Sequence, residues 1–503
     1  MTALLALLAA CAEATPPQPP EQPSTTSVSR APVLAAQSEP SQAKSVPDDK
    51  DSGPRVTSIR DRTWIWREPK VEGERWLGYI RVGQSVRLRA PEKVRGIGCS
   101  QGFFAIEPRG YVCHDKTVTL ERDTPFLRAN AHAMPRSDSF PYEWAISSGA
   151  PMYARLPTPE EQQKTEWRYG KAGEHAPLAP FQRGHEHLAV TDPIAPNDPL
   201  PEFLKSRTTA RGGKLELLRR SIPHGSMLSY TRAFEHEGRT FVLSADLTLV
   251  PADRLRRFRR SNFRGIELGS KVKLPLAWFR VNDRPQYRRA GDDFEKSGKS
   301  WPVRSYVELT GREERHERRT YLEVKGGAWV DAEDATVVRA RDRRPFGVAP
   351  DEKWMIVSIS QGTLVAYEDL EPVFTTLISP GQGGIPRPGG DLVKDSTTPL
   401  GNYRITFKDR ATTMSPEIGV KDRTFWIADV PFTQYFRPPF AVHATYWHEK
   451  FGELMSGGCI NASPIDAAWL FRWTEPHVPD GWQGAVGAGA KENGKASWIV
   501  VTR

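Results

Sequence analysis

Two residues near the C-terminal end have the types and spacing of a nucleophile and its base. Cys459 lies in the run Ser456-Gly457-Gly458-Cys459-Ile460-Asn461, and His443 precedes it by sixteen positions. A cysteine thiolate attacks carbonyl carbon at neutral pH when a neighbouring base takes its proton. Glycines beside it allow a tight turn that aims backbone N–H groups at a developing oxyanion. The pattern predicts acyl-transfer chemistry at Cys459, and a buried structural thiol is the alternative.

The elements that position these residues are expected to be strands. With 43 Pro and 40 Gly, the sequence favours turns and short strands over long helices. A chain of 503 residues exceeds what one hydrophobic core usually serves, so we predict a mainly β, multidomain protein. The formal net charge of +9 is mild for this length. It favours anionic surroundings such as a cell wall or membrane face, and it is weak evidence for nucleic acid.

The first residues resemble an export signal. Residues 1–10 are apolar, and Leu7-Leu8-Ala9-Ala10-Cys11 resembles the lipobox of bacterial lipoprotein signal peptides. We expect residues 1–11 to be that signal and Cys11 to be lipidated, with a cleaved leader as the alternative. Ala12 favours the outer membrane over retention at the inner one. Residues 12–55 are rich in Pro, Ser, Gln, Thr and Ala, which predicts a disordered tether with a reach of roughly 35–40 Å.

Residues 56–120 alternate short apolar runs with turns, which predicts a small barrel of five or six strands. The segment resembles bacterial SH3-like domains, in which Gly110-Tyr111-Val112-Cys113 would be the closing strand. Cys99 and Cys113 would flank a hairpin, which favours a disulfide in an oxidising compartment; two buried free thiols are the alternative. If they pair and Cys11 is lipidated, Cys459 is the one free thiol left.

Residues 121–220 are predicted to be an irregular connecting region with one short helix. The helix is expected from Thr158-Pro159-Glu160-Glu161, a capping box with Pro at the first helical position, through Trp167. Three histidines in this region raise the question of a metal site: His175, His185 and His187. Neighbouring Gly and Pro residues predict a loop, and no further ligand falls at a recognisable spacing. We therefore predict solvated loop histidines and no metal.

Residues 221–345 show strand patterns again and are predicted to form a second SH3-like module. A basic run from Arg254 to Arg264 lies inside it. Such a run is usually a solvated face, and attraction to anionic wall polymer or lipid is the sharper alternative. No nucleic-acid-reading motif accompanies it, so no nucleic-acid partner is predicted.

The last part of the chain, residues 350–482, carries several ordered motifs. Residues 353–367 read as a hairpin, Thr398-Pro399-Leu400-Gly401 follows, and His443-Ala444-Thr445 precedes the Cys459 run. Together these motifs resemble the L,D-transpeptidase (YkuD-like) catalytic domain of bacterial cell-wall enzymes. The resemblance implies a β-sandwich-like domain with short helices, and it leaves residues 483–503 as a C-terminal extension.

The resemblance gives each motif residue a role. Cys459 matches the nucleophile and His443 its base, while Ser456, Gly457, Gly458 and Asn461 complete the motif. The N–H groups of Gly458 and Cys459 are the predicted oxyanion hole. Downstream, Ser463-Pro464-Ile465-Asp466 is predicted to cap a helix that braces the loop of Cys459. Ile465, Trp469 and Trp473 are expected to form its face toward the sheet.

Two positions depart from the family pattern. Ala444 stands where glycine is usual, and Gly457 stands where a histidine usually lines the site. The lost histidine predicts a slowed or altered enzyme. His448 is the residue expected to compensate, with a surface histidine as the alternative. Tyr446 and Trp447 are predicted either to form an aromatic wall for the substrate or to pack in the core.

The resemblance implies a periplasmic, lipid-anchored enzyme that acts on peptidoglycan stem peptides without a metal or organic cofactor. Cys459 would attack the carbonyl of the third stem residue, release D-alanine and pass the acyl group to an amine of another stem or of a protein. If water takes the acyl group, the enzyme is an L,D-carboxypeptidase. A catalytically inactive wall-binding scaffold is the competing hypothesis.

Overall fold

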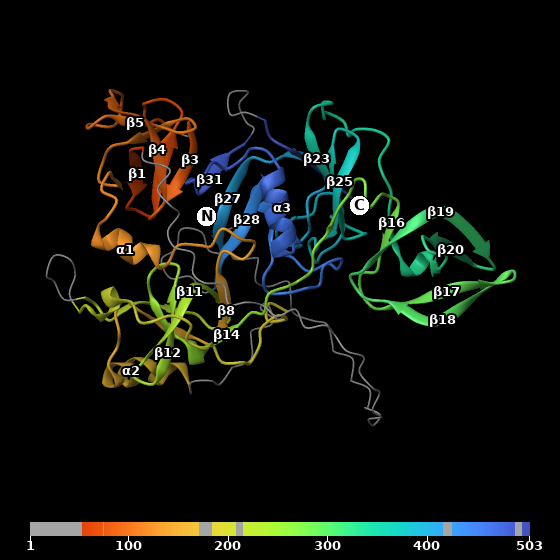
Figure 1. The fold of residues 1–503 in the computed structure, drawn as a ribbon, viewed down its shortest axis with the longest axis horizontal. Helices are drawn as coiled ribbons and strands as arrows, with labels where there is room; N and C mark the ends of the chain where they lie inside the picture. The colour runs from red at the N-terminus through yellow and green to blue at the C-terminus, as the bar shows by residue number, and fades with distance from the viewer. Residues whose placement is uncertain (1–52, 74, 171–183, 208–214, 416–424, 488–494) are drawn as a thin grey trace.

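The computed structural model describes residues 53–73, 75–170, 184–207, 215–415, 425–487 and 495–503. The predicted signal with Cys11, most of the predicted tether and His175 lie outside the described residues. Within these ranges the architecture is mainly β with short helices, as the sequence predicts (Figure 1). None of the described helices is long and apolar enough to cross a membrane.

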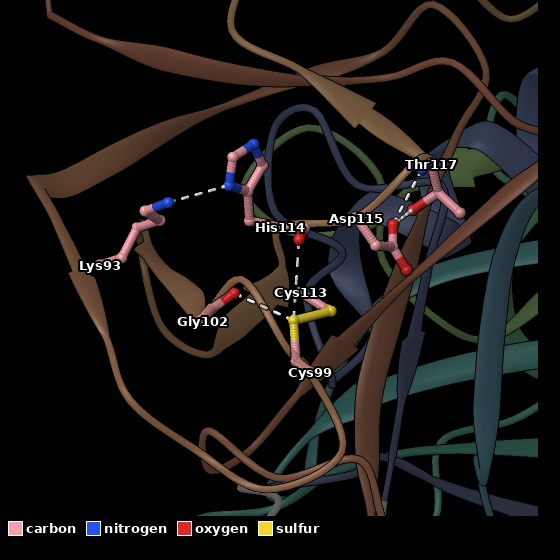
Figure 2. The surroundings of a disulfide bond; sticks show 7 residues. All are labelled: Lys93, Cys99, Gly102, Cys113, His114, Asp115 and Thr117. Carbon is pink, nitrogen blue, oxygen red and sulfur yellow. Dashed lines mark hydrogen bonds between the residues drawn. A yellow bond between two sulfur atoms is a disulfide. The ribbon is translucent and has the colours of Figure 1, made fainter.

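Residues 55–119 form a unit of short strands, here called the first module. Alternate residues such as Val56 and Ile65 fill its core. A disulfide joins Cys99 to Cys113, whose Cα atoms are 5.8 Å apart (Figure 2). The SH3-like assignment stays a prediction. The strands are β1 (Arg55–Ser58), β2 (Arg62–Trp66), β3 (Trp76–Arg81), β4 (Ser85–Val94), β5 (Phe103–Ile106), β6 (Tyr111–Cys113) and β7 (Val118–Thr119).

Strand pairing docks the first module onto the C-terminal part of the chain. β3 pairs antiparallel with β31 (Gly484–Val486), so that Gly78 lies opposite Ala485. A Cβ atom at position 78 would lie 2.2 Å from the Gly484 carbonyl oxygen, so only glycine fits there. Beside this contact the Tyr79 hydroxyl donates to Asp409 Oδ2 at 2.7 Å.

Residues 125–260 form a second unit, here called the middle domain, and it corrects the prediction of an irregular region over 121–220. β8 and β9 come from that region and pair with β11 and β10. Both strands are short and buried along their length, so they lack the alternation that marks a half-exposed strand. The elements, with η for a 3₁₀ helix, are α1 (Pro125–Ala131), β8 (Glu143–Ser147), β9 (Ala150–Tyr153), α2 (Pro159–Glu166), η2 (Trp167–Tyr169), η4 (Glu202–Lys205), β10 (Leu218–Ile222), β11 (Met227–His236), β12 (Arg239–Ser244), β13 (Leu249–Pro251), η5 (Ala252–Arg254) and β14 (Leu255–Arg257).

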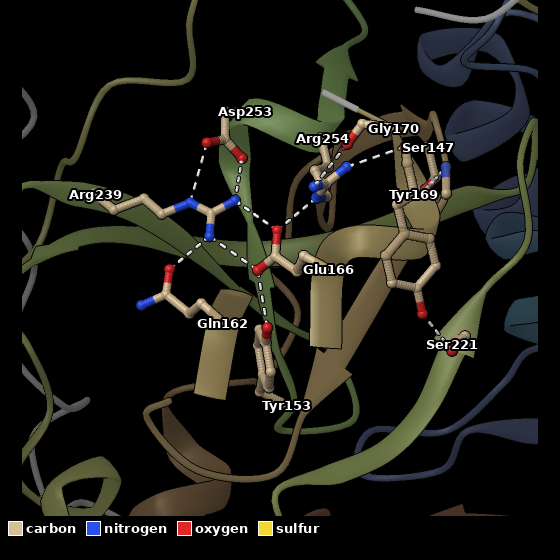
Figure 3. Close-up of polar contacts among 11 residues, drawn as sticks. Ser147, Tyr153, Gln162, Glu166, Tyr169, Gly170, Ser221, Arg239, Asp253 and Arg254 are labelled. Atoms are coloured by element: carbon tan, nitrogen blue, oxygen red, sulfur yellow. Dashed lines mark hydrogen bonds and ion pairs between the residues drawn. The ribbon is translucent and has the colours of Figure 1, made fainter. Parts of the chain in front are cut away.

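The predicted helix is confirmed as α2, with both hydrogen bonds of the Thr158 capping box present. Its last residue, Glu166, is buried and lies in an ion-pair network (Figure 3). The Glu166 carboxylate accepts from the Tyr153 hydroxyl at 2.8 Å, from both Nη atoms of Arg239 at 2.9 Å and from Arg254 Nε at 2.6 Å. Burial alone would raise the pKa of Glu166, but the two arginines outweigh it and lower the pKa. The network fixes α2 to the sheet.

Residues 276–338 form a separate seven-stranded sheet, here called the second module. The single module predicted over 221–345 is therefore wrong in extent, because β11 and β14 pair with β8, β13 pairs with β9, and β12 pairs with β11 and β13. Apolar runs in the sequence show where strands form, but they do not show which strands pair with each other. The elements are β16 (Leu276–Trp278), β17 (Arg284–Ala290), β18 (Asp293–Trp301), β19 (Tyr306–His316), β20 (Arg319–Val324), β21 (Trp329–Asp331), η6 (Ala332–Asp334) and β22 (Thr336–Val338).

The C-terminal part of the chain, predicted above to be the catalytic domain, places a six-stranded sheet, in the order β15-β25-β24-β23-β32-β26, against strands β27–β31. Side chains from both sheets, such as Met355, Leu364 and Val442, share one core. The predicted hairpin is confirmed as β23 and β24. The strands are β15 (Ile266–Glu267), β23 (Lys353–Ser358), β24 (Thr363–Glu368), β25 (Glu371–Leu377), β26 (Gly401–Arg404), β27 (Phe407–Met414), β28 (Ile427–Arg437), β29 (Phe440–Ala444), β30 (Ile460–Ala462) and β32 (Trp498–Thr502).

One further prediction about this domain is wrong, and another holds in part. Residues 483–503 are not an appended extension, because β32 lies between β23 and β26 in the sheet. The helix after Cys459 forms as α3 (Pro464–Trp473) with Ser463 as its cap, and its fully buried side chains include Ala467, Ala468 and Leu470. The expected face of Ile465, Trp469 and Trp473 is partly buried: Trp469 and Trp473 pack against the core between the sheets, and Trp469 stacks on Phe374 of β25.

One carboxylate joins three of these units. Asp429 of β28 accepts from Arg81 Nη1 of the first module at 3.0 Å and from the Ser229 hydroxyl of the middle domain. The same Arg81 nitrogen donates to the Tyr142 hydroxyl at 2.9 Å. Asp429 has a φ of +41°, an unfavourable conformation for a residue with a Cβ atom. The three units therefore meet at a buried carboxylate, and each of its two oxygen atoms accepts a hydrogen bond from another unit.

Candidate active site

Parallel strands bring the predicted nucleophile and base together. β29 and β30 pair in parallel with His443 opposite Asn461. The same register places Cys459, directly before β30, opposite Ala441. Residues two apart on a strand share a face, so positions 441 and 443 of β29 and 459 and 461 of β30 lie on one side. The site is therefore set by sheet register, and α3 follows it directly.

His443 is arranged to act as a neutral base. Its Nδ1 atom lies 3.0 Å from the Ala444 carbonyl oxygen, which can only accept, so Nδ1 carries the proton. Nε2 is left unprotonated. The side chain is 2% exposed, and burial lowers the pKa of His443 to about 4, against the opposing effect of the Ala444 hydrogen bond. The imidazole is therefore uncharged at neutral pH and can take a proton.

Cys459 is a thiol in the resting structure. It is partly exposed, and its Sγ atom lies 3.9 Å from the Pro439 carbonyl oxygen. Burial of the sulfur raises the pKa of Cys459 to about 11, although a hydrogen bond from the Ala441 backbone opposes the rise. Many reactive cysteines have a lowered pKa instead. The pair therefore rests as thiol and imidazole, without a preformed ion pair.

The turn before Cys459 uses one of the two predicted oxyanion donors. Gly458 N–H donates to Ser456 Oγ at 3.0 Å, and the same hydroxyl donates to the Cys459 carbonyl. The predicted hole of two N–H groups is thus incomplete in this conformation, and the Cys459 N–H is the donor left to it. Gly458 has a φ of +122°, and a Cβ there would lie 2.6 Å from the Phe440 ring, so glycine is required.

Position 457 is sterically open. Gly457 is exposed, and a Cβ atom there would meet nothing within 4 Å among the described residues. Its φ does not fall in the left-handed range either. The departure from the family pattern therefore removes a side chain without any change in the room available for one.

A family model decides the fold of this part of the chain. The model of the L,D-transpeptidase catalytic domain, YkuD, matches residues 352–487. This segment is an L,D-transpeptidase catalytic domain. A search of the curated proteins found no significant match.

Solved structures that resemble the chain are L,D-transpeptidases at low identity. One from Xylanimonas cellulosilytica is 20% identical, with a TM-score of 0.21, over 32% of this chain and 65% of its own, which is less than two thirds of it. One from Mycobacterium smegmatis is 20% identical, with a TM-score of 0.22, over 42% of this chain and 72% of its own. L,D-transpeptidase 3 from Mycobacterium tuberculosis is 20% identical, with a TM-score of 0.22, over 39% and 79%.

Within the transpeptidase domain His448 is buried, which rules out the surface alternative. Its Nδ1 atom accepts from Lys450 N–H at 3.2 Å, so Nε2 carries the proton. Nε2 lies 3.1 Å from the Asn461 amide, whose Oδ1 otherwise has no partner although it is buried. Turning the amide so that Oδ1 faces His448 satisfies both groups. His448 thus braces Asn461, the residue opposite His443.

Tyr446 and Trp447 pack in the core. Both are less than 5% exposed and belong to one apolar cluster with residues of the middle domain. Tyr446 stacks on Trp144 with ring centroids 4.4 Å apart, and its hydroxyl donates to the Ala428 carbonyl at 2.8 Å. The Trp447 ring lies 6.1 Å from that of His443. Of the two alternatives, core packing is the one observed.

The sequence did not reveal that a middle-domain loop contacts this site. Leu188 N–H donates to the Trp447 carbonyl at 3.1 Å, and the His185 ring lies 5.9 Å from that of Trp447. His187 Nδ1 accepts from Glu449 N–H at 3.2 Å. These histidines form no metal-binding group in the described part of the chain. Their His-x-His spacing was visible, but their contact with residues 260 positions away was not.

A groove of about 460 Å³ lies elsewhere, between residues 337–341 at the end of β22 and the β23–β24 hairpin. Its lining includes neither Cys459 nor His443. The chemistry assigned to Cys459 is therefore not located there.

Proposed function

We propose that this protein is a cysteine-dependent L,D-transpeptidase that acts on peptidoglycan stem peptides. The register of β29 and β30 carries the proposal, because it sets His443 beside Asn461 and Cys459 beside Ala441 within a transpeptidase domain. The proposal assigns Cys459 as nucleophile and His443 as its base.

Acylation follows from the neutral resting pair. As Cys459 Sγ attacks the carbonyl carbon of the third stem residue, its proton passes to His443 Nε2. The tetrahedral oxyanion is stabilised by the Cys459 N–H, and one such donor is commonly worth about 2.7–4 kcal/mol. The C–N bond to D-alanine then breaks, and the imidazolium returns the proton to the leaving amine. The product is a thioester on Cys459.

Deacylation repeats these steps in reverse with a new acceptor. His443 Nε2 takes a proton from the incoming amine as its nitrogen attacks the thioester, and the thiol of Cys459 leaves with that proton. An amine of another stem or of a protein gives a cross-link or an anchored protein. Water gives the trimmed tripeptide of an L,D-carboxypeptidase.

Intact mass measurement tests the chemistry. Wild-type protein incubated with a carbapenem should gain one stable adduct, and Cys459→Ala should gain none. Absence of an adduct on wild type, together with retained binding to isolated sacculi, would instead establish a wall-binding scaffold. Product analysis with stem peptides, with and without an amine acceptor, then separates transfer from hydrolysis.

The proposed location is the periplasm, with a lipid on Cys11 holding the protein at the outer membrane. The lipobox-like run before Cys11 supports this. Metabolic labelling with a lipid should mark wild type and not Cys11→Ser. An unlabelled protein recovered in the soluble periplasmic fraction would refute the anchor.

A further inference from the structure

The segment that links β29 to the Cys459 turn, residues 445–456, is here called the catalytic loop. Its own domain holds it through several hydrogen bonds, which include those of Thr445, Met455 and Ser456 N–H to the carbonyls of Ala462 and Pro380. Ser379 Oγ donates to the Lys450 carbonyl at 2.7 Å, and Gly452 N–H donates to the Ile378 carbonyl at 2.9 Å. Because the loop runs from His443 to Cys459, its position fixes the two reacting groups relative to each other.

The middle domain contacts the same loop. It meets the loop twice, through the Leu188 backbone N–H at Trp447 and through the His187 side chain at Glu449, as described above. In addition, Arg259 Nη2 lies 3.2 Å from Glu449 Oε2. Glu449 therefore contacts the middle domain through its backbone and through its carboxylate.

The second module contacts the loop from another side. Arg304 Nη2 lies 3.4 Å from the same Glu449 Oε2 atom. Arg280 Nη1 donates to the Gly452 carbonyl at 3.1 Å and to the Ser360 carbonyl at 3.0 Å. Arg304 has a φ of +61°, a strained conformation for a residue with a side chain. Such strain persists only where surrounding contacts hold it, and here the residue reaches Glu449.

Burial of Glu449 raises the free-energy cost of losing its charged partners. The Glu449 side chain is only 9% exposed, so its charge has lost most of its water. Two guanidinium groups from two separate units converge on one of its oxygens. Removal of either leaves the other as the remaining charged partner in this contact, and removal of both leaves a nearly buried, uncompensated carboxylate in the catalytic loop.

We propose that Glu449 is a positioning residue through which the middle domain and the second module together set the rate of acylation at Cys459. The proposal rests on the proposed function, since it concerns the same nucleophile. It assigns to the accessory units a direct part in catalysis: they hold the catalytic loop, and with it the alignment of His443 and Cys459.

Kinetics on the full chain test this. Arg259→Gln, Arg304→Gln and Glu449→Gln should each lower the limiting rate of Cys459 acylation by a carbapenem at least tenfold. The carbapenem concentration at half-maximal rate should change less than twofold, because alignment and not binding is altered. Arg304→Lys should recover most of the rate. A thermal melt within the range of the controls shows that each variant is folded.

Matched controls come from the same units. Arg257→Gln removes the ion pair with Asp192 in the middle domain, and Arg289→Gln removes the ion pair with Glu314 in the second module. Neither contact touches the catalytic loop, so both variants should acylate at the wild-type rate.

The Glu449→Gln background tests whether the two arginines act through one residue. There, Arg259→Gln and Arg304→Gln should have no further effect. Wild-type rates in all three single variants, or undiminished effects of the arginine changes in that background, would overturn the proposal.

A second measurement does not depend on acylation of Cys459. Hydrogen exchange at the Glu449 and Gly452 amides should be faster in both arginine variants than in wild type and the controls. If wild type is not acylated but exchange responds as stated, the proposed function fails while the hold on the loop stands. If wild type is acylated but neither rate nor exchange responds, the positioning role fails alone.

Discussion

At the scale of single residues, Cys459 and His443 are both uncharged at rest, because the sulfur of one and the imidazole of the other have lost most of their water. The raised pKa of the thiol and the lowered pKa of the imidazole keep their proton on sulfur until a substrate arrives. A thiol in this state is protected from alkylation and oxidation, which attack the thiolate. The substrate itself must therefore trigger the proton transfer.

This state predicts two different pH profiles. Alkylation of Cys459 by iodoacetamide should keep rising toward about pH 11, since only the thiolate reacts. Acylation by a carbapenem needs neutral His443, so its rate should fall only as pH drops toward about 4. Mass spectrometry after timed exposure measures both. An alkylation plateau already reached at neutral pH would show a preformed thiolate instead.

Removal of the base gives a companion measurement. His443→Ala should lower acylation by about 10²–10⁴ without changing the fold, the range typical of one general base. An unchanged rate would mean that another group takes the proton.

The two glycines before Cys459 should respond in opposite ways. Gly457→His restores the family's histidine into open space, so the unfolding free energy should stay within about 0.5 kcal/mol of wild type. Gly458→Ala forces a Cβ against Phe440 at a strained φ, which should cost about 1–3 kcal/mol and slow acylation. Urea unfolding and acylation rates measure both. An equal loss of unfolding free energy and of acylation rate in the two variants would contradict the assigned geometry.

Local motifs were enough to predict the helix cap at Ser463 and to select Cys459 and His443, whose catalytic roles stay a proposal. They were not enough for His448, which is buried in the fold and contacts Asn461 thirteen positions away. They were also not enough for Gly458, because its N–H is taken by a hydroxyl whose direction depends on the folded turn.

At the scale of elements, the Glu166 network shows how a short helix is held against a sheet (Figure 3). A carboxylate at the last residue of a helix faces the negative end of the helix dipole, so the arginines must offset that as well as burial. The cap at Thr158 could be predicted from sequence. The fixing of the other end could not, because Arg239 and Arg254 lie more than seventy positions away.

Glu166→Gln should destabilise the chain by about 3–5 kcal/mol at neutral pH, because it removes one partner of a buried ion pair. The lowered pKa means that this contribution is present above the usual pKa of glutamate and is lost as pH falls through the folded-state value. Urea unfolding of wild type and variant should therefore converge at acid pH. Glu295→Gln, which breaks an exposed ion pair with Arg288, is the control and should change stability by less than about 1 kcal/mol.

At the scale of the whole molecule, the units are joined by strand pairing as well as by linkers. Through the pairings of β3 with β31 and β11 with β28, the first module, the middle domain and part of the catalytic domain form one 19-stranded sheet in the described chain. Sequence patterns predicted the strand-rich composition but not these partners. Domain boundaries drawn from gaps between apolar runs therefore cut through sheets, as they did at positions 220 and 482.

The last strand should be indispensable. Ile499 of β32 is fully buried between the sheets, so Ile499→Ala should lower the unfolding free energy by about 2–5 kcal/mol. Deletion of residues 495–503 removes a strand flanked on both sides and should leave the chain insoluble. Soluble yield and urea unfolding measure these effects. Lys495→Ala, which removes an exposed ion pair with Asp351, should have little effect; a soluble, active deletion variant would refute the assignment.

The meeting of three units at Asp429 has a consequence for sequence variation. Its partners Arg81 and Ser229 lie 348 and 200 positions away, yet both hydrogen-bond to the one buried carboxylate of Asp429. A lineage that loses this acid should lose the arginine as well, since the guanidinium would keep only the Tyr142 hydroxyl and no opposite charge. In a family alignment, positions 81, 229 and 429 should therefore vary together. A lesion at one of them should find its genetic suppressors at the other two.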